Sequence, residues 1–277
     1  MTKLELGDNT IYCRSKAGFG TSMILWEARL AFDAGAIDHH LLACDSLFIS
    51  HAHTDHIGQL PSFLAQRQLI GKGTATLFTP PTLGAELPAL LNHWGALART
   101  PLDFRVITLY PYTPIILSNR FVVTGFPLRH TVETHGYMVE RLQRPLPTKF
   151  RQLPSGDVEE LTDSPFGPSQ SNPASPVFAY IPDTAAEALD ELPELVWKAE
   201  ILAVECTWAL DVSQERIDRH RHTTMRQLAQ RLHRHSGNHI ILFHASASNS
   251  HQEFVEASQA LMPPSLLEKL TLLPHTP

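Results

Sequence analysis

The sequence has little cysteine, no excess of positive charge and no long apolar run, and each absence excludes a class of protein. The three cysteines, Cys13, Cys44 and Cys206, are far apart and odd in number, which argues against a disulfide framework and favours a reducing compartment. The formal net charge is −6, so a nucleic-acid role would depend on a local basic patch. No window is apolar enough to span a membrane, and the first residues lack an apolar signal core. We therefore expect a soluble, cytoplasmic protein with no membrane partner.

The overall composition is that of an ordinary globular protein. Of the 277 residues, 43% are hydrophobic and 18% are charged, which is enough apolar material for a sizeable core. Strand patterns come first in a block and then alternate with helical patterns, without an internal repeat or a clean domain boundary. Residues 143–176 are rich in proline, serine and glycine, and we interpret them as a long excursion outside the core.

Apolar periodicity and turn residues predict the positions of the helices and strands. We expect strands at 21–26, 29–35, 46–50, 74–79, 104–110, 115–118, 120–127, 136–142, 177–184, 201–207 and 239–244. We expect helices at 58–70, 83–97, 185–199, 223–235 and 251–261, the second of which contains Pro88. Among the less common residues, Trp94, Trp197 and Trp208 are expected in the core. His233, His235 and His239 are expected at the surface.

The most informative stretch is "HAHTDH", residues 51–56, which begins where the apolar strand 46–50 ends. A strand would direct His51 and His53 to one face, because side chains alternate with a period of two. After the strand, Asp55 and His56 can turn toward a second point nearby. Imidazole nitrogens and carboxylate oxygens are ligands that a zinc-like ion accepts. The loop could therefore offer two ligands to each of two neighbouring ions. A polar loop with chance histidines explains this spacing poorly.

Four residues cannot complete two coordination shells, so further ligands are expected downstream. His130, Asp183 and His244 each follow an apolar strand, and Asp183 could bridge two ions. Any one of them could be an ordinary surface residue at a strand end. Their recurrence in the same context favours a common metal site.

These residues in this order resemble the metallo-β-lactamase superfamily. The resemblance implies one domain over residues 1–277 with an α+β fold, an αββα four-layer sandwich of two mixed β-sheets flanked by helices. It also implies a dinuclear zinc site, with Mn²⁺ or Fe²⁺ as alternative metals. In that site one ion is held by His51, His53 and His130, the other by Asp55, His56 and His244, and Asp183 bridges them.

Further motifs resemble the short form of the ribonuclease Z family. They are "GTSMILWEARLAFDAG" (20–35), "HTVETHGYMV" (130–139), "VECTW" (204–208) and "HTTMRQLAQ" (222–230). The resemblance implies an endoribonuclease that removes the 3′ trailer from precursor tRNA and that forms a homodimer.

The same resemblance suggests roles for the catalytic residues Asp55, Glu205 and His222. Two metal ions lower the pKa of a bridging water, and Asp55 is placed to orient that water or accept its proton. His222, kept protonated by Glu205, would supply a proton to the leaving 3′-oxygen. Without the metal motif, Glu205 would be read as a solvated residue at a strand end. His222 would likewise be read as a polar residue at the start of a helix.

Some departures from the ribonuclease Z pattern keep other functions open. In that family the last metal histidine is usually followed by Phe-Ser, one residue and Arg-Tyr, whereas "HASASN" (244–249) has Ser248 and Asn249 at the last two positions. The expected bridging aspartate follows Pro182 where the family has glycine, and no long basic arm is evident. Besides the ribonuclease Z activity, a second interpretation is a hydrolase of a small phosphodiester or another ester. A third interpretation is a metal-bound scaffold without catalysis.

Overall fold

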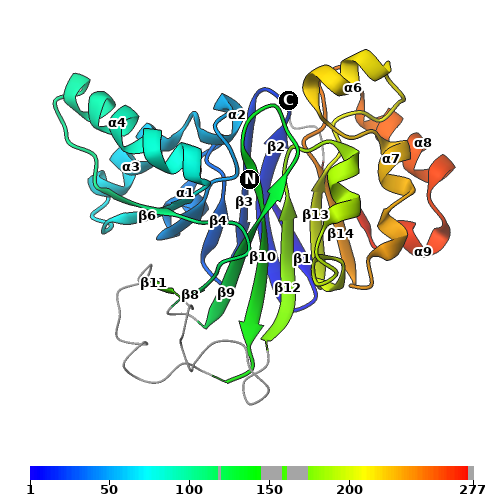
Figure 1. Cartoon of the computed structure of the whole chain (residues 1–277), viewed down its shortest axis with the longest axis horizontal. Helices are drawn as coiled ribbons and strands as arrows, with labels where there is room; N and C mark the ends of the chain where they lie inside the picture. The colour runs from blue at the N-terminus through cyan, green and yellow to red at the C-terminus, as the bar shows by residue number, and fades with distance from the viewer. Residues whose placement is uncertain (118–119, 145–157, 161–173, 274–277) are drawn as a thin grey trace.

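The computed structural model describes residues 1–117, 120–144, 158–160 and 174–273, and its centre is formed by two β-sheets that face each other (Figure 1). The first sheet has seven strands, in sequence order β1 (Thr2–Leu6), β2 (Asn9–Lys16), β3 (Gly20–Leu25), β4 (Leu30–Phe32), β5 (Ser46–Phe48), β6 (Ala75–Thr79) and β7 (Phe104–Thr108). The second has eight, in spatial order β11 (Val158–Glu160), β8 (Pro114–Leu117), β9 (Phe121–Leu128), β10 (Thr134–Leu142), β12 (Ala174–Ile181), β13 (Ile201–Glu205), β14 (His239–Phe243) and β15 (Leu270–Leu272). Within the excursion expected at 143–176, residues 145–157 and 161–173 lie outside the described part of the chain.

Both sheets are mixed, as expected. In the first sheet β1 to β4 pair antiparallel and β4 to β7 pair parallel. In the second sheet the pairs from β11 to β12 are antiparallel, and those from β12 to β15 are parallel. Parallel strands run in the same direction, so the residues that follow them meet at one edge of the sheet.

Helices cover the outer face of each sheet and complete four layers (Figure 1). The first sheet is covered by α1 (His39–Leu42), α2 (Thr54–Ile57), α3 (Leu60–Leu69) and α4 (Pro81–Leu97). The second sheet is covered by α6 (Gln214–His220), α7 (Met225–Ala229), α8 (His251–Leu261) and α9 (Pro264–Leu267), with short 3₁₀ turns η1 (Ala186–Glu191), η2 (Val196–Lys198) and η3 (Leu232–Arg234). The four-layer αββα prediction is therefore confirmed.

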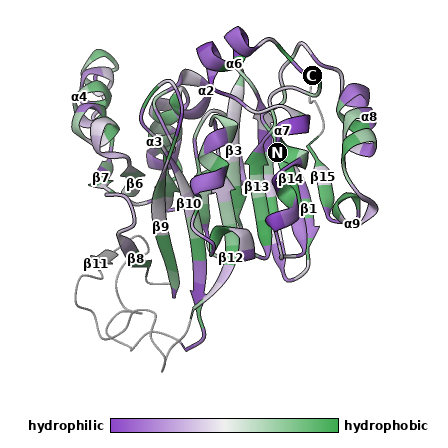
Figure 2. Cartoon of the chain, turned by 45° about the vertical axis from the view of Figure 1, so that its right-hand side comes forward, coloured by the Kyte–Doolittle hydropathy of each residue, from purple (hydrophilic) through white to green (hydrophobic). Residues whose placement is uncertain are grey.

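The core is divided by the sheets into layers. Between the sheets, aromatic residues from both sides pack together, including Phe32, Phe48, Tyr137, Phe178 and Tyr180, all fully buried. Separate apolar clusters lie between each sheet and its helices. Figure 2 shows hydrophobic residues along β3, β13 and β14 and hydrophilic residues on α6. Burial of this apolar area is the main stabilising contribution to the sandwich.

Two of the predicted helices are wrong in extent. The helix expected at 185–199 is replaced by η1 and η2, because Pro193 cannot continue a helix and places Leu192 in an extended conformation. The helix expected at 223–235 ends at Ala229 in α7, after which the chain tightens into η3. The helix at 83–97 is confirmed as α4, with Pro88 inside it.

Two side-chain placements also differ from expectation. Trp94 is 53% exposed, on the same side of α4 as Leu90 and Leu97. Apolar residues occur on both sides of this helix, so its sequence does not indicate which side packs inward. His235 is buried, and its Nε2 contacts the carbonyl oxygen of Ala199 at 2.8 Å.

Within the described ranges, no helix combines the length and the apolar character needed to cross a bilayer.

Candidate metal centre

The predicted metal ligands meet at one edge of the sandwich and come from both sheets. Residues 51–56 follow β5 of the first sheet. His130, Asp183 and His244 follow β9, β12 and β14 of the second sheet. The turn after β14 is sharp, because His244 itself has a left-handed backbone with φ 65°. The strand-end prediction therefore brings all seven predicted ligands together, although they span most of the chain.

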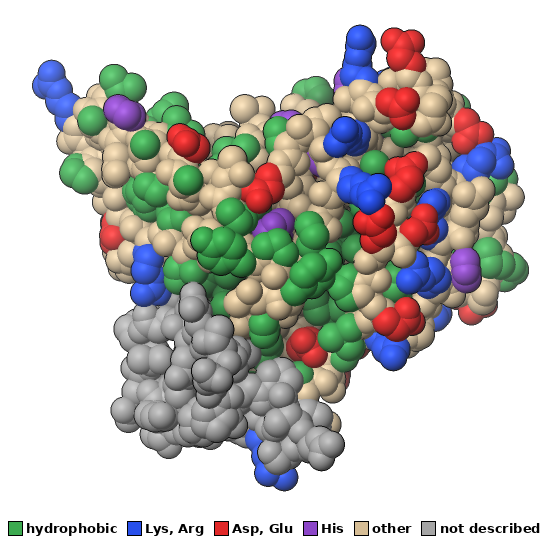
Figure 3. Space-filling view, viewed as in Figure 1, with side chains coloured by type: hydrophobic (Ala, Val, Ile, Leu, Met, Phe, Trp, Pro, Cys, Tyr) green, Lys and Arg blue, Asp and Glu red, His purple; other side chains and the backbone are tan. Residues whose placement is uncertain are grey.

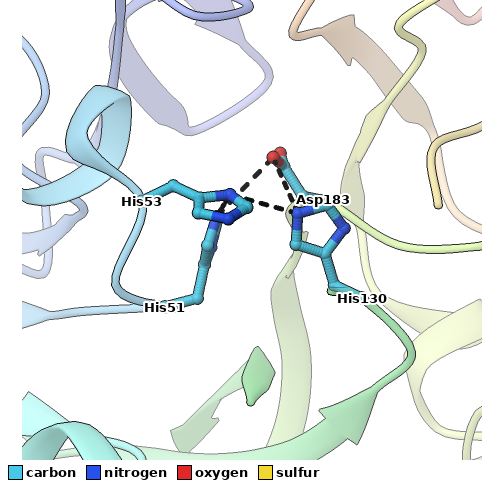
Figure 4. A group of neighbouring side chains, drawn as sticks. All are labelled: His51, His53, His130 and Asp183. Carbon is cyan, nitrogen blue, oxygen red and sulfur yellow. Dashed lines mark hydrogen bonds and ion pairs between the residues drawn. The ribbon is translucent and has the colours of Figure 1, made fainter. Parts of the chain in front are cut away.

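The first group of ligand atoms consists of three imidazoles and one oxygen of Asp183 (Figure 4). His53 Nδ1 lies 3.1 Å from His51 Nε2 and 3.2 Å from His130 Nε2. Asp183 Oδ2 lies 3.6 Å from His51 Nε2 and 3.7 Å from His130 Nε2. Donors that surround a tetrahedral zinc ion at about 2.0–2.1 Å are about 3.3 Å apart. The separations in this group fit such an ion.

The second group uses the other oxygen of the same aspartate. Asp183 Oδ1 lies 3.4 Å from His56 Nε2 and 3.3 Å from His244 Nε2. His244 Nε2 is also 3.3 Å from Asp55 Oδ2. Asp183 is buried, and its Oδ1 accepts no hydrogen bond from any described residue. A buried carboxylate oxygen without a donor requires compensation. A second cation between these donors fits that requirement.

Hydrogen bonds at the far ring nitrogens orient four of the histidines. The partners are Ser50 Oγ for His51 (2.9 Å), Asp33 Oδ2 for His56 (2.7 Å), the Arg221 carbonyl for His130 (3.1 Å) and Thr207 Oγ1 for His244 (3.1 Å). A carbonyl can only accept, so His130 Nδ1 carries the proton and its Nε2 presents a lone pair to the first group. Such partners fix the tautomer and orientation of metal-binding imidazoles.

Asp33 is the important residue that sequence reasoning did not single out. Its buried carboxylate accepts hydrogen bonds from Ser50 N, Ser50 Oγ and the Tyr180 hydroxyl, each at 2.7 Å, in addition to its contact with His56. Its backbone is left-handed, with φ 59°. The "Phe-Asp-x-Gly" pattern in residues 20–35 was the available signal. It marked a family resemblance without indicating what the carboxylate contacts.

Burial favours the neutral form of three of the predicted ligands. Desolvation lowers the pKa of His51 and His53 below their usual value and lowers the pKa of His130 to about 4. A neutral imidazole has a free lone pair, so no proton has to leave these rings before a cation binds.

His56 and Asp183 form the charged part of the cluster. Burial opposes the charge on both groups, but Asp183 and then Asp33 outweigh it for His56, and His244 and then His56 outweigh it for Asp183. The pKa of His56 is therefore raised well above its usual range, and the pKa of Asp183 is held well below. Cation binding at Asp183 would compete with the proton on His56.

Glu205 and His222 lie beside this cluster. Glu205 is fully buried, and its oxygens accept hydrogen bonds at 2.9 Å from the backbone N–H groups of Thr207 and Thr223. His222 Nδ1 is 3.4 Å from Glu205 Oε1 and 4.0 Å from Asp183 Oδ2. Burial opposes protonation of His222, but Glu205 and then Asp183 outweigh it and raise its pKa. The arrangement can hold an imidazolium close to the cluster.

The residues that stand in place of Arg-Tyr contact their own loop and the loop after β13. Ser248 Oγ is 2.9 Å from Ser246 Oγ, and Asn249 Oδ1 accepts a hydrogen bond from Ala209 N at 3.3 Å. They stabilise the loop after His244.

Comparison with known proteins extends these observations. Residues 27–245 match the family described as Beta-lactamase superfamily domain. The chain is 28% identical over 252 residues to tRNase Z TRZ1 of Arabidopsis thaliana, covering 90% of each protein. It is 30% identical over 159 residues to the nuclear ribonuclease Z of Triticum aestivum, covering 57% of this chain and 90% of the relative. Among solved structures, the metallo-beta-lactamase fold protein YhfI from Bacillus subtilis superposes with a TM-score of 0.63 at 12% identity, covering 95% of this chain and 96% of YhfI.

Proposed function

The chain belongs to the β-lactamase superfamily and, within it, to the ribonuclease Z family, and from that membership we propose that it removes the 3′ trailer from precursor tRNA. Membership of this family makes the chain a metal-dependent hydrolase. The observation that carries the finer proposal is the position of Asp183, whose two oxygens face two separate groups of ligand atoms. We propose that these groups hold two Zn²⁺ ions, with Mn²⁺ or Fe²⁺ as alternatives.

Two divalent ions in such a site supply an activated water and stabilise negative charge on the phosphate. We propose that Asp55, besides its role as a ligand, orients this water and accepts its proton, while the Gly18 N–H, which donates to its Oδ2 at 2.7 Å, holds the carboxylate in position. As the water oxygen bonds to phosphorus, the bond from phosphorus to the 3′-oxygen breaks. His222 then donates its proton to that oxygen.

Glu205 would keep His222 in place and protonated during this step. Its carboxylate is itself fixed by backbone N–H groups on both sides, so it can hold the imidazolium without moving. Glu205 and His222 are therefore proposed as one proton-donating unit, with Asp55 on the attacking side.

Cleavage of labelled precursor tRNA by the metal-loaded protein is the direct test of this function. We expect a cut just after the discriminator base, and a loss of about 1000-fold or more in Asp55→Ala, which removes both a ligand and the water's partner. An intact substrate after incubation with active, metal-loaded protein would contradict the tRNA assignment.

An open cavity next to the metal centre offers a place for a nucleotide. It has a volume of about 390 Å³ and is lined in part by Arg14, Lys16, Phe19 and Gln59. The Phe19 ring is 71% exposed, with Lys16 Nζ 4.7 Å from its centroid. Neighbouring Gly18 contacts the Asp55 carboxylate, which connects this loop directly to the metal centre. A base stacked on Phe19, with its phosphate near Arg14 and Lys16, would suit this cavity.

Phe19→Ala should therefore weaken RNA binding without affecting the chemistry. Loss of a stacked base is worth about 1–3 kcal/mol, so KM for precursor tRNA should rise by about tenfold. Steady-state kinetics should show a smaller change with bis(p-nitrophenyl) phosphate, which has no flanking nucleotide to place in the cavity. Leu69→Ala, at a side chain that is 85% exposed, is the matched control. Equal effects of Phe19→Ala on the two substrates would contradict a nucleotide site here.

A second candidate function is hydrolysis of a small phosphodiester. It is favoured by Ser248 and Asn249 in place of the family's Arg-Tyr and by the net charge of −6. Figure 3 shows acidic and basic side chains interspersed on the side where Figure 1 places α6 to α9. Turnover of bis(p-nitrophenyl) phosphate without cleavage of precursor tRNA would favour this candidate.

The remaining proposals concern the whole protein. One domain over residues 1–277 is supported by the core between the sheets, in which Phe32 and Phe48 of the first sheet pack with Phe178 and Tyr180 of the second. A cytoplasmic location is supported by Cys13, Cys44 and Cys206, which are free and buried. A homodimer is proposed from the family resemblance and is testable by sedimentation.

A further inference from the structure

Arg221 adopts a backbone conformation that is unusual for its residue type. It caps the C-terminus of α6 with φ 52° and ψ 54°, in the left-handed region that glycine occupies most readily. Its N–H donates to the carbonyl of Ile217 at 2.7 Å, so the turn ends the helix cleanly. An arginine at this position suggests that its side chain has a role that glycine could not fill.

Arg221 contacts His130 at two points, once through its backbone carbonyl and once through its side chain. The Arg221 carbonyl accepts a hydrogen bond from His130 Nδ1 at 3.1 Å, and Arg221 Nη1 donates to the His130 carbonyl at 2.8 Å. The first bond orients the imidazole ring. The second joins the loop after α6 to the end of β9, where His130 lies.

Thr223, two residues after Arg221, is held by Glu205. Thr223 N donates to Glu205 Oε1 at 2.9 Å, and Thr223 Oγ1 donates to the Glu205 carbonyl at 2.8 Å. His222 lies between these anchors, with its Nδ1 3.4 Å from Glu205 Oε1. The position of His222 relative to the metal centre therefore depends on both contacts. Loss of the contact from Arg221 Nη1 would leave the Arg221 side of His222 attached to His130 by one hydrogen bond instead of two.

We propose that Arg221 is a positioning residue that holds His222 at a fixed position relative to His130 and the metal centre. The proposal rests on the proposed function, in which His222 protonates the leaving 3′-oxygen. Arg221 itself transfers no proton and binds no metal. Its guanidinium fixes the distance across which the proton moves, and proton transfer is very sensitive to such a distance.

Arg221→Gly isolates the guanidinium. Glycine accepts the left-handed conformation and retains the carbonyl that orients His130, so only the contact from Nη1 to the His130 carbonyl is lost. The readout is a comparison of leaving groups. Precursor tRNA and a dinucleoside monophosphate release an alkoxide that needs a proton, whereas bis(p-nitrophenyl) phosphate releases p-nitrophenolate, which does not.

We expect kcat for the two nucleotide substrates to fall by about tenfold or more, with less than about a twofold change for bis(p-nitrophenyl) phosphate. Zn²⁺ affinity, measured by competition with a chelator, should stay within about threefold of the unaltered protein, because the ring of His130 keeps its partner. Equal losses on all substrates, together with weaker Zn²⁺ binding, would overturn the proposal and make Arg221 a support of the metal site alone.

Two further variants separate the proposal from its premise. His222→Ala should show the same dependence on leaving group. If neither variant shows it, the proton-donor role fails and the positioning role fails with it. If only His222→Ala shows it, the positioning role alone is overturned. Arg219→Ala removes the same charge from α6 and should behave like the unaltered protein, since an equal loss there would attribute the effect of Arg221 to charge.

Discussion

Replacing Asp183 by asparagine is expected to abolish hydrolysis and to reduce the metal content of the purified protein from the proposed two ions per chain to one or fewer. The carboxylate is buried, and each of its oxygens faces a different group of ligand atoms. Asparagine preserves the shape but removes the charge and one of the two acceptor oxygens. Turnover of bis(p-nitrophenyl) phosphate should fall by about 1000-fold or more, because both ions lose a shared ligand.

Elemental analysis of the dialysed protein and turnover of the diester measure this effect together, with circular dichroism as a check of folding. Asp190→Asn is a matched control, since Asp190 is an exposed aspartate that pairs with Arg231 at the surface, at 2.8–2.9 Å. It should retain full metal content and activity, because an exposed ion pair contributes little. Retention of two ions and normal turnover by Asp183→Asn would exclude the bridging role.

Asp33→Asn is expected to destabilise the metal-free protein by about 3 kcal/mol, and to weaken metal binding by about 10- to 100-fold. Asn tolerates a left-handed backbone, so the substitution should leave the turn at φ 59° intact. It places an amide group, which is partly a donor, opposite the donors of Ser50 and Tyr180. It also removes the negative partner of His56.

Urea unfolding of the metal-free variant separates the loss of folding stability from any loss of bound metal. Tyr180→Phe serves for comparison, because it removes one of the donors to Asp33 and leaves the contact with His56 unchanged. It should cost about 1 kcal/mol and leave metal affinity close to normal. A midpoint for Asp33→Asn equal to that of the unaltered protein would mean that the carboxylate is not required for stability.

The candidate site was more predictable from the sequence than the fold around it. His51, His53, Asp55 and His56 lie within six residues, and their more distant partners each follow an apolar strand, so a local pattern was sufficient to predict that these side chains would meet. Asp33 was not assigned a role, because its partners lie on two separate segments, residues 50–56 and β12, that only the folded chain brings to it. Its importance is a property of packing and not of spacing.

Among the elements, the errors have local causes. Pro193 was a visible helix breaker inside the predicted 185–199 helix. The strands β1 and β2 were not predicted, although the inward residues Ile11, Cys13 and Ser15 alternate with polar ones along β2. Trp94 illustrates a different limit. The hydrophobicity of a side chain indicates that burial is favourable. Whether a neighbouring element covers the side chain depends on the fold.

The division of the ligands between the two sheets has a mechanical consequence. Residues 51–56 follow a strand of the first sheet, and His130, Asp183 and His244 follow strands of the second. Metal ions bound between them would therefore link the two sheets at this edge of the sandwich. The two sheets could then separate at this edge only after the metal ions dissociate. Separation of the sheets at this edge would then be resisted by coordination bonds, whereas at the opposite edge the sheets are joined by apolar packing and by the hydrogen bonds of Asn9 with Arg141 and Glu200. The edge that carries the metal centre would then be the part of the sandwich that most resists separation of the sheets.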